Sequence, residues 1–226
     1  MKKTLFITLL LTSIFLFGCT QKSESETCAL DESYACTEET KTEIKTGTEI
    51  ETEIEEKTIP MTALDTAKEI LTALKSKSIE TLTTYIKNEG KVRFSPYSYV
   101  NTETDVMLNA QELTIAFQSS WKTITRGSYD WSGEPIKLSF SDYLDRFIYD
   151  LDFFNAPQVI ENQDIMRGNT INNAFDIYTD AHIIEFHIPW IDIQYDGMDW
   201  RSLILVLEKT DEKRNLIGII HNQRTI

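Results

Sequence analysis

The chain has 226 residues, of which 22 are Lys or Arg and 36 are Asp or Glu, so its formal net charge is −14. Proteins that bind nucleic acids or anionic lipid surfaces concentrate basic side chains, and this acidic composition therefore argues against nucleic acid as a partner. All three cysteines precede residue 60, so the rest of the chain must be stabilised by a hydrophobic core rather than by disulfides.

The first eighteen residues predict export from the cytoplasm. Two lysines precede residues 4–17, which are uncharged and mostly apolar. Gly18 comes next and is followed by Cys19. A basic start, an apolar stretch and a small residue at the cleavage position are typical of a secretory signal peptide. The apolar run is shorter than the roughly 20 residues that a membrane-spanning helix needs. Residues 1–18 are therefore interpreted as a cleaved signal peptide.

The motif at the cleavage position also predicts an anchor. Leu16-Phe17-Gly18-Cys19 resembles the lipobox of bacterial lipoproteins, in which the cysteine after the cut is acylated and becomes the new N-terminus. The resemblance implies that Cys19 is the lipid anchor. It also implies that the mature protein is held at the extracytoplasmic face of a bacterial membrane, which makes this membrane its first expected partner.

Residues 19–60 are expected to form a lipidated, disordered tether. Residues 20–60 hold twelve acidic and four basic side chains, and the stretch from residue 37 to residue 58 repeats Thr, Glu and Ile without any aromatic residue. Such a segment repels itself and can bury little apolar surface, so disorder is favoured. Cys28 and Cys36 lie within it, and the sequence leaves open whether they form a disulfide.

Residues 61–226 are predicted to form a single α+β domain that begins with helices. Apolar residues recur at helical spacing in four segments, residues 63–74, 79–86, 108–118 and 141–151, each of which predicts a helix. A turn is expected at residues 94–97, and the segment GSYDWSGEP at residues 127–135 predicts a loop because it is rich in turn formers.

The C-terminal third predicts strands. Residues 181–188, 202–209 and 216–221 are short apolar runs, and the last two read as an antiparallel hairpin joined by residues 210–215. One or two more strands are expected within residues 158–178. Helices followed by strands predict helices on one face of an antiparallel sheet. The other face then needs a second layer or a partner subunit, so a homodimer is one of the expected states.

This order of elements resembles the nuclear-transport-factor-2-like superfamily, whose cystatin-like cone packs N-terminal helices into a curved antiparallel sheet. Residues 91–226 also resemble an uncharacterised family of bacterial lipoproteins. Five segments carry this second resemblance: KVRFSPY (91–97), SGEPI (132–136), GNTINN (168–173), GMDWRSL (197–203) and GIIHNQRTI (218–226). The resemblance implies a fold and a location, but it implies no activity and no catalytic residue.

Four polar residues on the predicted strands are candidates for catalysis. Alternation along residues 181–188 places Glu185 and His187 on one face, while Arg201 and His221 lie on the other two C-terminal strands. If all four faced one cavity between sheet and helices, they would supply an acid–base pair and a guanidinium for positioning an anion. The competing interpretation is a structural ion pair between Glu185 and His187, with His221 as a satisfied polar residue.

Neither a metal nor another cofactor is expected. Zinc is disfavoured because strand alternation points His182 and His187 to opposite faces, so the two could not meet His221 at one ion. No Gly-rich phosphate loop, Gly-x-Ser-x-Gly or His-Glu-x-x-His motif occurs. A calcium site in the loop before Trp200 is disfavoured too, since the spacing of its acidic residues departs from the helix–loop–helix motif; they are Asp192, Asp196 and Asp199.

Aromatic residues are dense in the predicted loops, and four of them are candidates for a rim that stacks on a sugar or an apolar ligand: Tyr97, Tyr129, Trp131 and Trp200. The alternative is that these rings close the open end of the core. Together these observations predict a non-catalytic module that binds a small ligand or an envelope protein. An isomerase, dehydratase or hydrolase that uses Glu185, His187 and His221 is the first alternative, and a structural envelope protein is the second.

Overall fold

The computed structural model describes residues 61–119, 123–210 and 213–224. The predicted signal peptide, the Cys19 anchor and the acidic tether all lie outside these residues. Within the described ranges, no helix is both long and apolar enough to cross a lipid bilayer.

The helices α1 and α3 begin at side chains that accept hydrogen bonds from their free N-terminal amides. α1 (Ala63–Lys75) starts at a capping box of Thr62 and Asp65, and α3 (Ala110–Gln118) starts at one formed by Asn109 and Glu112. The other helical segments are α2 (Ile79–Thr83), α4 (Phe140–Phe147), α5 (Ala174–Ile177) and two short 3₁₀ turns, η1 (Phe153–Asn155) and η2 (Ile193–Tyr195). The four helices expected from apolar spacing are therefore confirmed, although the second and fourth end earlier than the pattern does.

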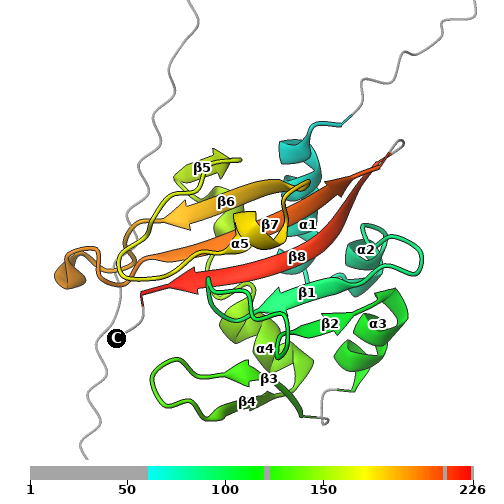
Figure 1. Cartoon of the computed structure of the whole chain (residues 1–226), viewed down its shortest axis with the longest axis horizontal. Helices are drawn as coiled ribbons and strands as arrows, with labels where there is room; N and C mark the ends of the chain where they lie inside the picture. Colours follow the sequence, from blue (N-terminus) through cyan, green and yellow to red (C-terminus); the bar gives the residue numbers. More distant parts are fainter. Residues whose placement is uncertain (1–60, 120–122, 211–212, 225–226) are drawn as a thin grey trace, which may run out of the picture. The chain divides into compact units, whose positions relative to one another are not determined.

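Six strands form the main sheet in the order β2-β1-β8-β7-β6-β5 (Figure 1). Their bounds are β1 (Val92–Ser95), β2 (Val106–Leu108), β5 (Gln158–Glu161), β6 (His182–Ile188), β7 (Arg201–Lys209) and β8 (Arg214–Gln223). The expected C-terminal strands and their hairpin are confirmed, and residues 158–178 contribute one strand, β5. Neighbouring strands are antiparallel except β1 and β8, which run parallel. The sheet is thus mixed, and the expectation of an antiparallel sheet throughout is wrong.

Two strand pairs occur where the sequence predicts turns. The expected turn at residues 94–97 overlaps β1, whose Val92 and Phe94 are buried. The expected loop at 127–135 is the connection of a separate hairpin formed by β3 (Ile124–Ser128) and β4 (Pro135–Leu138). Strands of four or five residues contain too few positions for a two-residue alternation to stand out.

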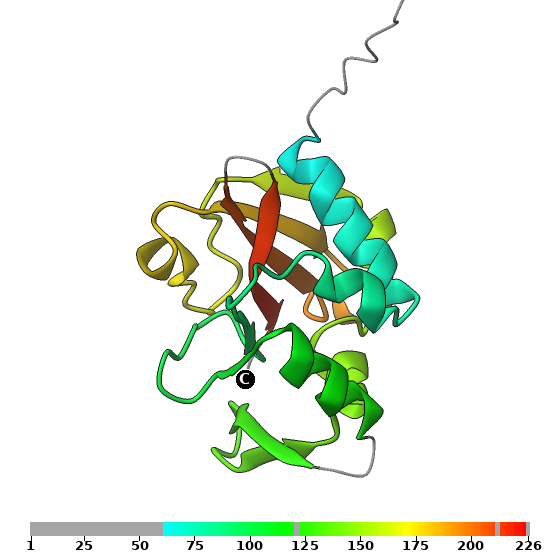
Figure 2. The ribbon, with the colours of Figure 1, turned by 90° about the vertical axis from the view of Figure 1, so that its right-hand side faces the viewer.

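The main sheet is covered on both faces, as Figure 2 shows. Leu203, Leu205 and Leu207 of β7 pack in one core with α1, whereas the intervening Ile204 and Val206 belong to a second cluster with Val100 and Ala174. The chain itself therefore supplies a layer over the face away from α1, which we call the outer face. The face toward α1 is called the inner face. Burial of Ile204 and Val206 requires no partner subunit, and the homodimer stays a prediction.

Candidate functional site

The four polar candidates lie on opposite faces of the sheet. His187 lies beside Ser202 of β7, whereas His221 lies beside Leu203, the next residue along β7. Because successive residues of a strand point to opposite faces, the two histidines cannot share one. Glu185 accompanies His187 on the outer face, and Arg201 accompanies His221 on the inner face. The expectation that all four converge on one cavity is therefore wrong, whereas the predicted alternation along β6 is confirmed.

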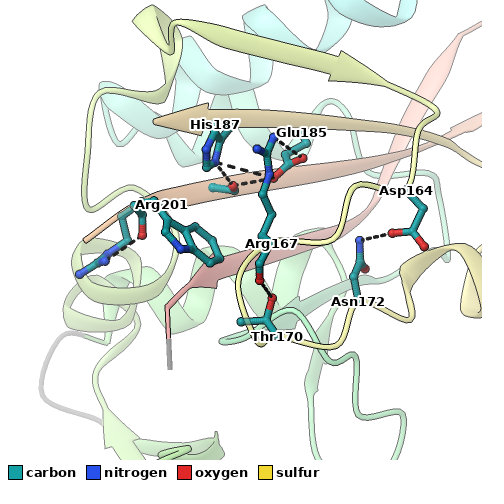
Figure 3. A network of polar contacts seen from close by, with 9 residues as sticks. Asp164, Arg167, Thr170, Asn172, Glu185, His187 and Arg201 are labelled. Atoms are coloured by element: carbon teal, nitrogen blue, oxygen red, sulfur yellow. Dashed lines mark hydrogen bonds and ion pairs between the residues drawn. The ribbon is translucent and has the colours of Figure 1, made fainter. Parts of the chain in front are cut away.

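The outer-face residues form a buried polar chain (Figure 3). Arg167 reaches over from the segment between β5 and α5 and binds Glu185 through two hydrogen bonds, Nε to Oε1 at 3.1 Å and Nη2 to Oε2 at 3.3 Å. The Ser202 hydroxyl donates to Glu185 Oε1 at 2.6 Å, and His187 Nδ1 lies 2.8 Å from the same hydroxyl oxygen. Glu185, His187 and Ser202 are all at least 95 % buried.

The direction of these hydrogen bonds limits the chemistry of the cluster. The single Ser202 proton is donated to Glu185, so His187 must donate its own Nδ1 proton to the Ser202 oxygen. Burial, together with the charge of Arg167, lowers the pKa of His187 to about 4 against a smaller opposing effect of Glu185. His187 is thus neutral near pH 7, and its 4.0 Å contact with Glu185 is not an ion pair there. The ion pair of this cluster is Arg167–Glu185.

The inner-face cluster is built around Asp150, which follows α4. Asp150 accepts a hydrogen bond from His221 Nε2 at 3.1 Å and pairs with Arg201 Nε at 3.3 Å. Burial would raise the pKa of the Asp150 carboxyl, but the hydrogen bond from His221 and the charges of His221 and Arg201 outweigh it, so the pKa is lowered. His221 itself is fully buried, and its ring meets Phe147 edge to face.

His187, Ser202 and His221, which would be the reactive groups of the two clusters, are buried in the protein. A nucleophilic serine needs an adjacent base to accept its proton, whereas Ser202 is fully buried, donates its hydroxyl proton to Glu185 in a hydrogen bond and accepts a hydrogen bond from His187 Nδ1. His221 is enclosed between Asp150 and Phe147. What the two clusters do is hold chain segments together: Arg167 fastens the segment before α5 to the outer face, and Asp150 fastens the end of α4 to the inner face.

A cleft of about 210 Å³ lies beside the segment that Arg167 fastens. Three stretches of chain form its wall: the residues after β1, the turn between β3 and β4, and the segment before α5. The lining residues are Tyr97, Ser98, Tyr99, Asp130, Asn169, Thr170 and Ile171. They include two aromatic rings, an amide, two hydroxyls and one carboxylate, but no Lys or Arg. Such a wall suits a neutral polar ligand with an apolar face better than an anion.

Hydrogen bonds between two of these stretches fix the shape of the cleft. The side chain of Asn173 accepts from the Val100 amide at 2.7 Å and donates to the Val100 carbonyl at 3.1 Å. Tyr97 is anchored from behind by an edge-to-face contact with Phe147, with ring centroids 5.7 Å apart. Burial raises the pKa of the Tyr97 phenol, so it stays protonated and available for hydrogen bonding. The cleft is therefore held in place from two sides.

The four aromatic candidates divide between surface and core. Tyr97 lines the cleft, and Trp131, which follows Asp130 in the chain, is 73 % exposed. Tyr129 is half-buried, with its ring between those of Trp131 and Phe147. Trp200 is 7 % exposed and packs against His187 and Gly168, so it belongs to the core beside the buried polar chain of the outer face. Tyr99, another of the loop aromatics but not one of these four candidates, also lines the cleft and is 56 % exposed.

A larger hollow of about 650 Å³ lies between α1 and the β7–β8 hairpin, lined among others by Thr62, Tyr85 and Lys213. It is lined by none of the candidate residues. As to metals, no group of three or more His, Cys, Asp or Glu side chains within the described ranges is placed to hold an ion.

Comparisons with known proteins add little to this geometry. No protein-family model matches the sequence, and no curated protein matches it significantly. Among solved structures, the chain is similar to the crystal structure of a DUF4783 family protein from Bacteroides ovatus. That similarity has a TM-score of 0.32 and 11 % sequence identity, and covers 70 % of this chain and 94 % of that chain. A similarity of this size does not bear on activity or ligand.

Proposed function

We propose that this protein is a non-catalytic binding module, anchored through Cys19 at the extracytoplasmic face of a bacterial membrane, which binds a small neutral ligand in the Tyr97–Tyr99 cleft. The observation that carries the proposal is the cleft itself, whose wall combines an exposed ring with amide, hydroxyl and carboxylate groups and includes no Lys or Arg. The buried state of both histidine clusters supports binding over catalysis. We further propose that the fold is a variant of the cystatin-like cone, which α1 lying across the sheet supports. The parallel pairing of β1 with β8 is the feature that differs from an antiparallel cone.

The chemistry of the cleft favours a saccharide ring as the ligand. Sugars combine an apolar face, which stacks on tyrosine or tryptophan, with hydroxyls that pair with amide, hydroxyl and carboxylate groups. Asn169, Thr170 and Asp130 offer such groups beside Tyr99. Partial desolvation raises the pKa of the Asp130 carboxyl, as is common for polar groups in ligand sites.

A binding panel tests the cleft. We expect at least one neutral mono- or disaccharide to show saturation-transfer NMR signals with the purified chain, and Tyr99→Ala to weaken its binding by about 3- to 10-fold, which is the size of one lost ring contact. Trp190→Ala is the matched control, since it removes an exposed ring from a different loop. Equal binding by Tyr99→Ala and the parent, or no saccharide binding at all, would contradict the proposed ligand class.

The anchor is tested separately. Cys19→Ser removes the thiol that acylation requires, so the variant should accumulate as uncleaved or released protein instead of fractionating with membranes. The multiple acyl chains of processed lipoproteins explain why the parent should stay bound, because a single chain anchors only marginally. Membrane fractionation and mass spectrometry of the N-terminus measure both outcomes. Processing and membrane attachment identical to the parent would disprove the lipid anchor.

A further inference from the structure

The β6–β7 loop, residues 189–199, exposes more apolar surface than a solvated loop needs. Five of its large apolar side chains are about half or more exposed: Trp190 (61 %), Ile191 (48 %), Ile193 (89 %), Tyr195 (50 %) and Met198 (50 %). Isolated exposed apolar residues are ordinary, but contiguous ones mark an interaction surface. Trp, Tyr and Met are also among the residue types that are enriched in protein–protein interfaces.

The loop holds these side chains outward by its own hydrogen bonds. The Asp199 carboxylate accepts from the amides of Ile191 at 3.1 Å and Asp192 at 2.7 Å. The Asp192 carboxylate in turn accepts from the Gln194 amide at 3.0 Å and from its side chain at 2.6 Å. A loop organised in this way presents its apolar groups in a defined arrangement, which reduces the conformational entropy that binding must remove.

The charge of the loop identifies the kind of partner. Residues 189–199 include three aspartates and no Lys or Arg. Arg201, the next arginine along the chain, pairs with Asp150 on the inner face and donates to the Asp199 carbonyl. An anionic membrane surface would repel such a loop, because segments that bind anionic lipid do so through Lys and Arg side chains. Entry into any bilayer would also bring the Asp192 and Asp199 carboxylates with the apolar side chains, because both are hydrogen-bonded within the same loop.

We propose that the β6–β7 loop is a docking element for a second protein, whose surface has an apolar recess bordered by Lys or Arg side chains. Trp190, Ile193 and Tyr195 enter the recess, and the aspartates pair with its basic border. Buried aromatic anchors supply most of the affinity in such interfaces, and the charged border supplies orientation and rate of association. This docking surface is independent of the saccharide cleft, since the two are formed by different loops.

Site-specific photo-crosslinking in the full chain tests the proposal. p-Benzoylphenylalanine is introduced in place of Ile193 in cells of the producing bacterium, with the same group in place of Ile115 of α3 as the matched control, because Ile115 is also exposed (52 %). We expect one discrete protein adduct at position 193 that is absent at position 115. Mass spectrometry should place the cross-link beside apolar residues and Lys or Arg, and adding Trp190→Ala should remove the adduct.

The affinity of the identified partner then tests the two parts of the surface separately. Trp190→Ala combined with Ile193→Ala should weaken binding at least tenfold, whereas Asp196→Asn should weaken it by about 2- to 5-fold and reduce its dependence on salt. Asparagine is chosen because Asp196 has a positive φ of 49°, which asparagine tolerates. The same Asp196→Asn change should leave saccharide binding unaltered.

Four outcomes would overturn the docking proposal. They are the absence of an adduct above the Ile115 control, an adduct that persists with Trp190→Ala, an adduct to another copy of this chain, and an adduct to lipid. Vesicle sedimentation gives an independent check. Sedimentation of the full chain carrying Cys19→Ser with phosphatidylcholine vesicles, with or without phosphatidylglycerol, should be the same whether or not Trp190→Ala is added, and vesicle binding that Trp190→Ala abolishes would assign the loop to the membrane instead.

Discussion

Asp150→Ala is expected to lower the free energy of unfolding by about 3 kcal/mol, because it removes the carboxylate from a largely buried cluster. His221 is fully buried and pairs through Nε2 with Asp150, while its Nδ1 has no hydrogen-bond partner among the described residues. Arg201 would keep its bonds to the carbonyls of Asp199 and Trp200 but lose its counter-charge. Urea unfolding followed by circular dichroism measures the change.

The matched control is Asp145→Ala on the neighbouring helix α4. Asp145 also pairs with a basic residue, Lys77, but both side chains are about half exposed, and exposed pairs contribute about 0–1 kcal/mol. We therefore expect Asp145→Ala to leave stability nearly unchanged. Comparable losses in the two variants would show that the buried cluster has no special role in stability.

The parts of the fold that were predictable from sequence are those whose periodicity is long enough to see. Thirteen residues of α1 and nine of β7 offer several repeats of their spacing, and hairpin signals join β7 to β8. β1 has four residues and pairs with β8 from more than a hundred residues away in the chain. Its parallel pairing depends on tertiary packing, which no local pattern records.

The candidate site shows the same division. Alternation along β6 places Glu185 and His187 on one face, and this step needs only the strand assignment. Whether Arg201 and His221 share the face of Glu185 depends on the register between the strands. The long β6–β7 loop does not fix that register from the sequence, so these two residues could not be assigned to a face. Arg167 and Asp150 were missed altogether, because a partner that reaches over from an irregular segment leaves no spacing signal.

Both proposed binding surfaces are formed by loops that the sheet and the buried clusters hold in place, as is common for functional sites on rigid scaffolds. Arg167 fastens the segment that forms one wall of the cleft, and its partner Glu185 lies on β6. Loosening that ion pair should therefore affect the cleft more than the β6–β7 loop, which has its own aspartate hydrogen bonds.

His187, in the buried polar chain of the outer face, is expected to make the protein less stable in mild acid. The pKa of His187 is about 4 in the folded chain and 6.5 as its ordinary value, so between these values the unfolded chain binds more protons than the folded one. Stability contributed by neutral His187 is thus complete above pH 6.5 and is lost as pH falls toward 4. At 1.36 kcal/mol per unit, the loss reaches about 3 kcal/mol.

His187→Gln isolates this effect from the acid groups that titrate in the same range. Glutamine does not titrate, and its amide can donate to Ser202 as His187 Nδ1 does. Urea unfolding of parent and variant from pH 7.5 to pH 4 should show the parent losing about 3 kcal/mol more than His187→Gln. The carboxylates are present in both chains, so their contribution cancels in the difference. If both chains lost stability equally with falling pH, His187 would not be held neutral by burial and Arg167, and the cluster would have to be protonated in the folded state.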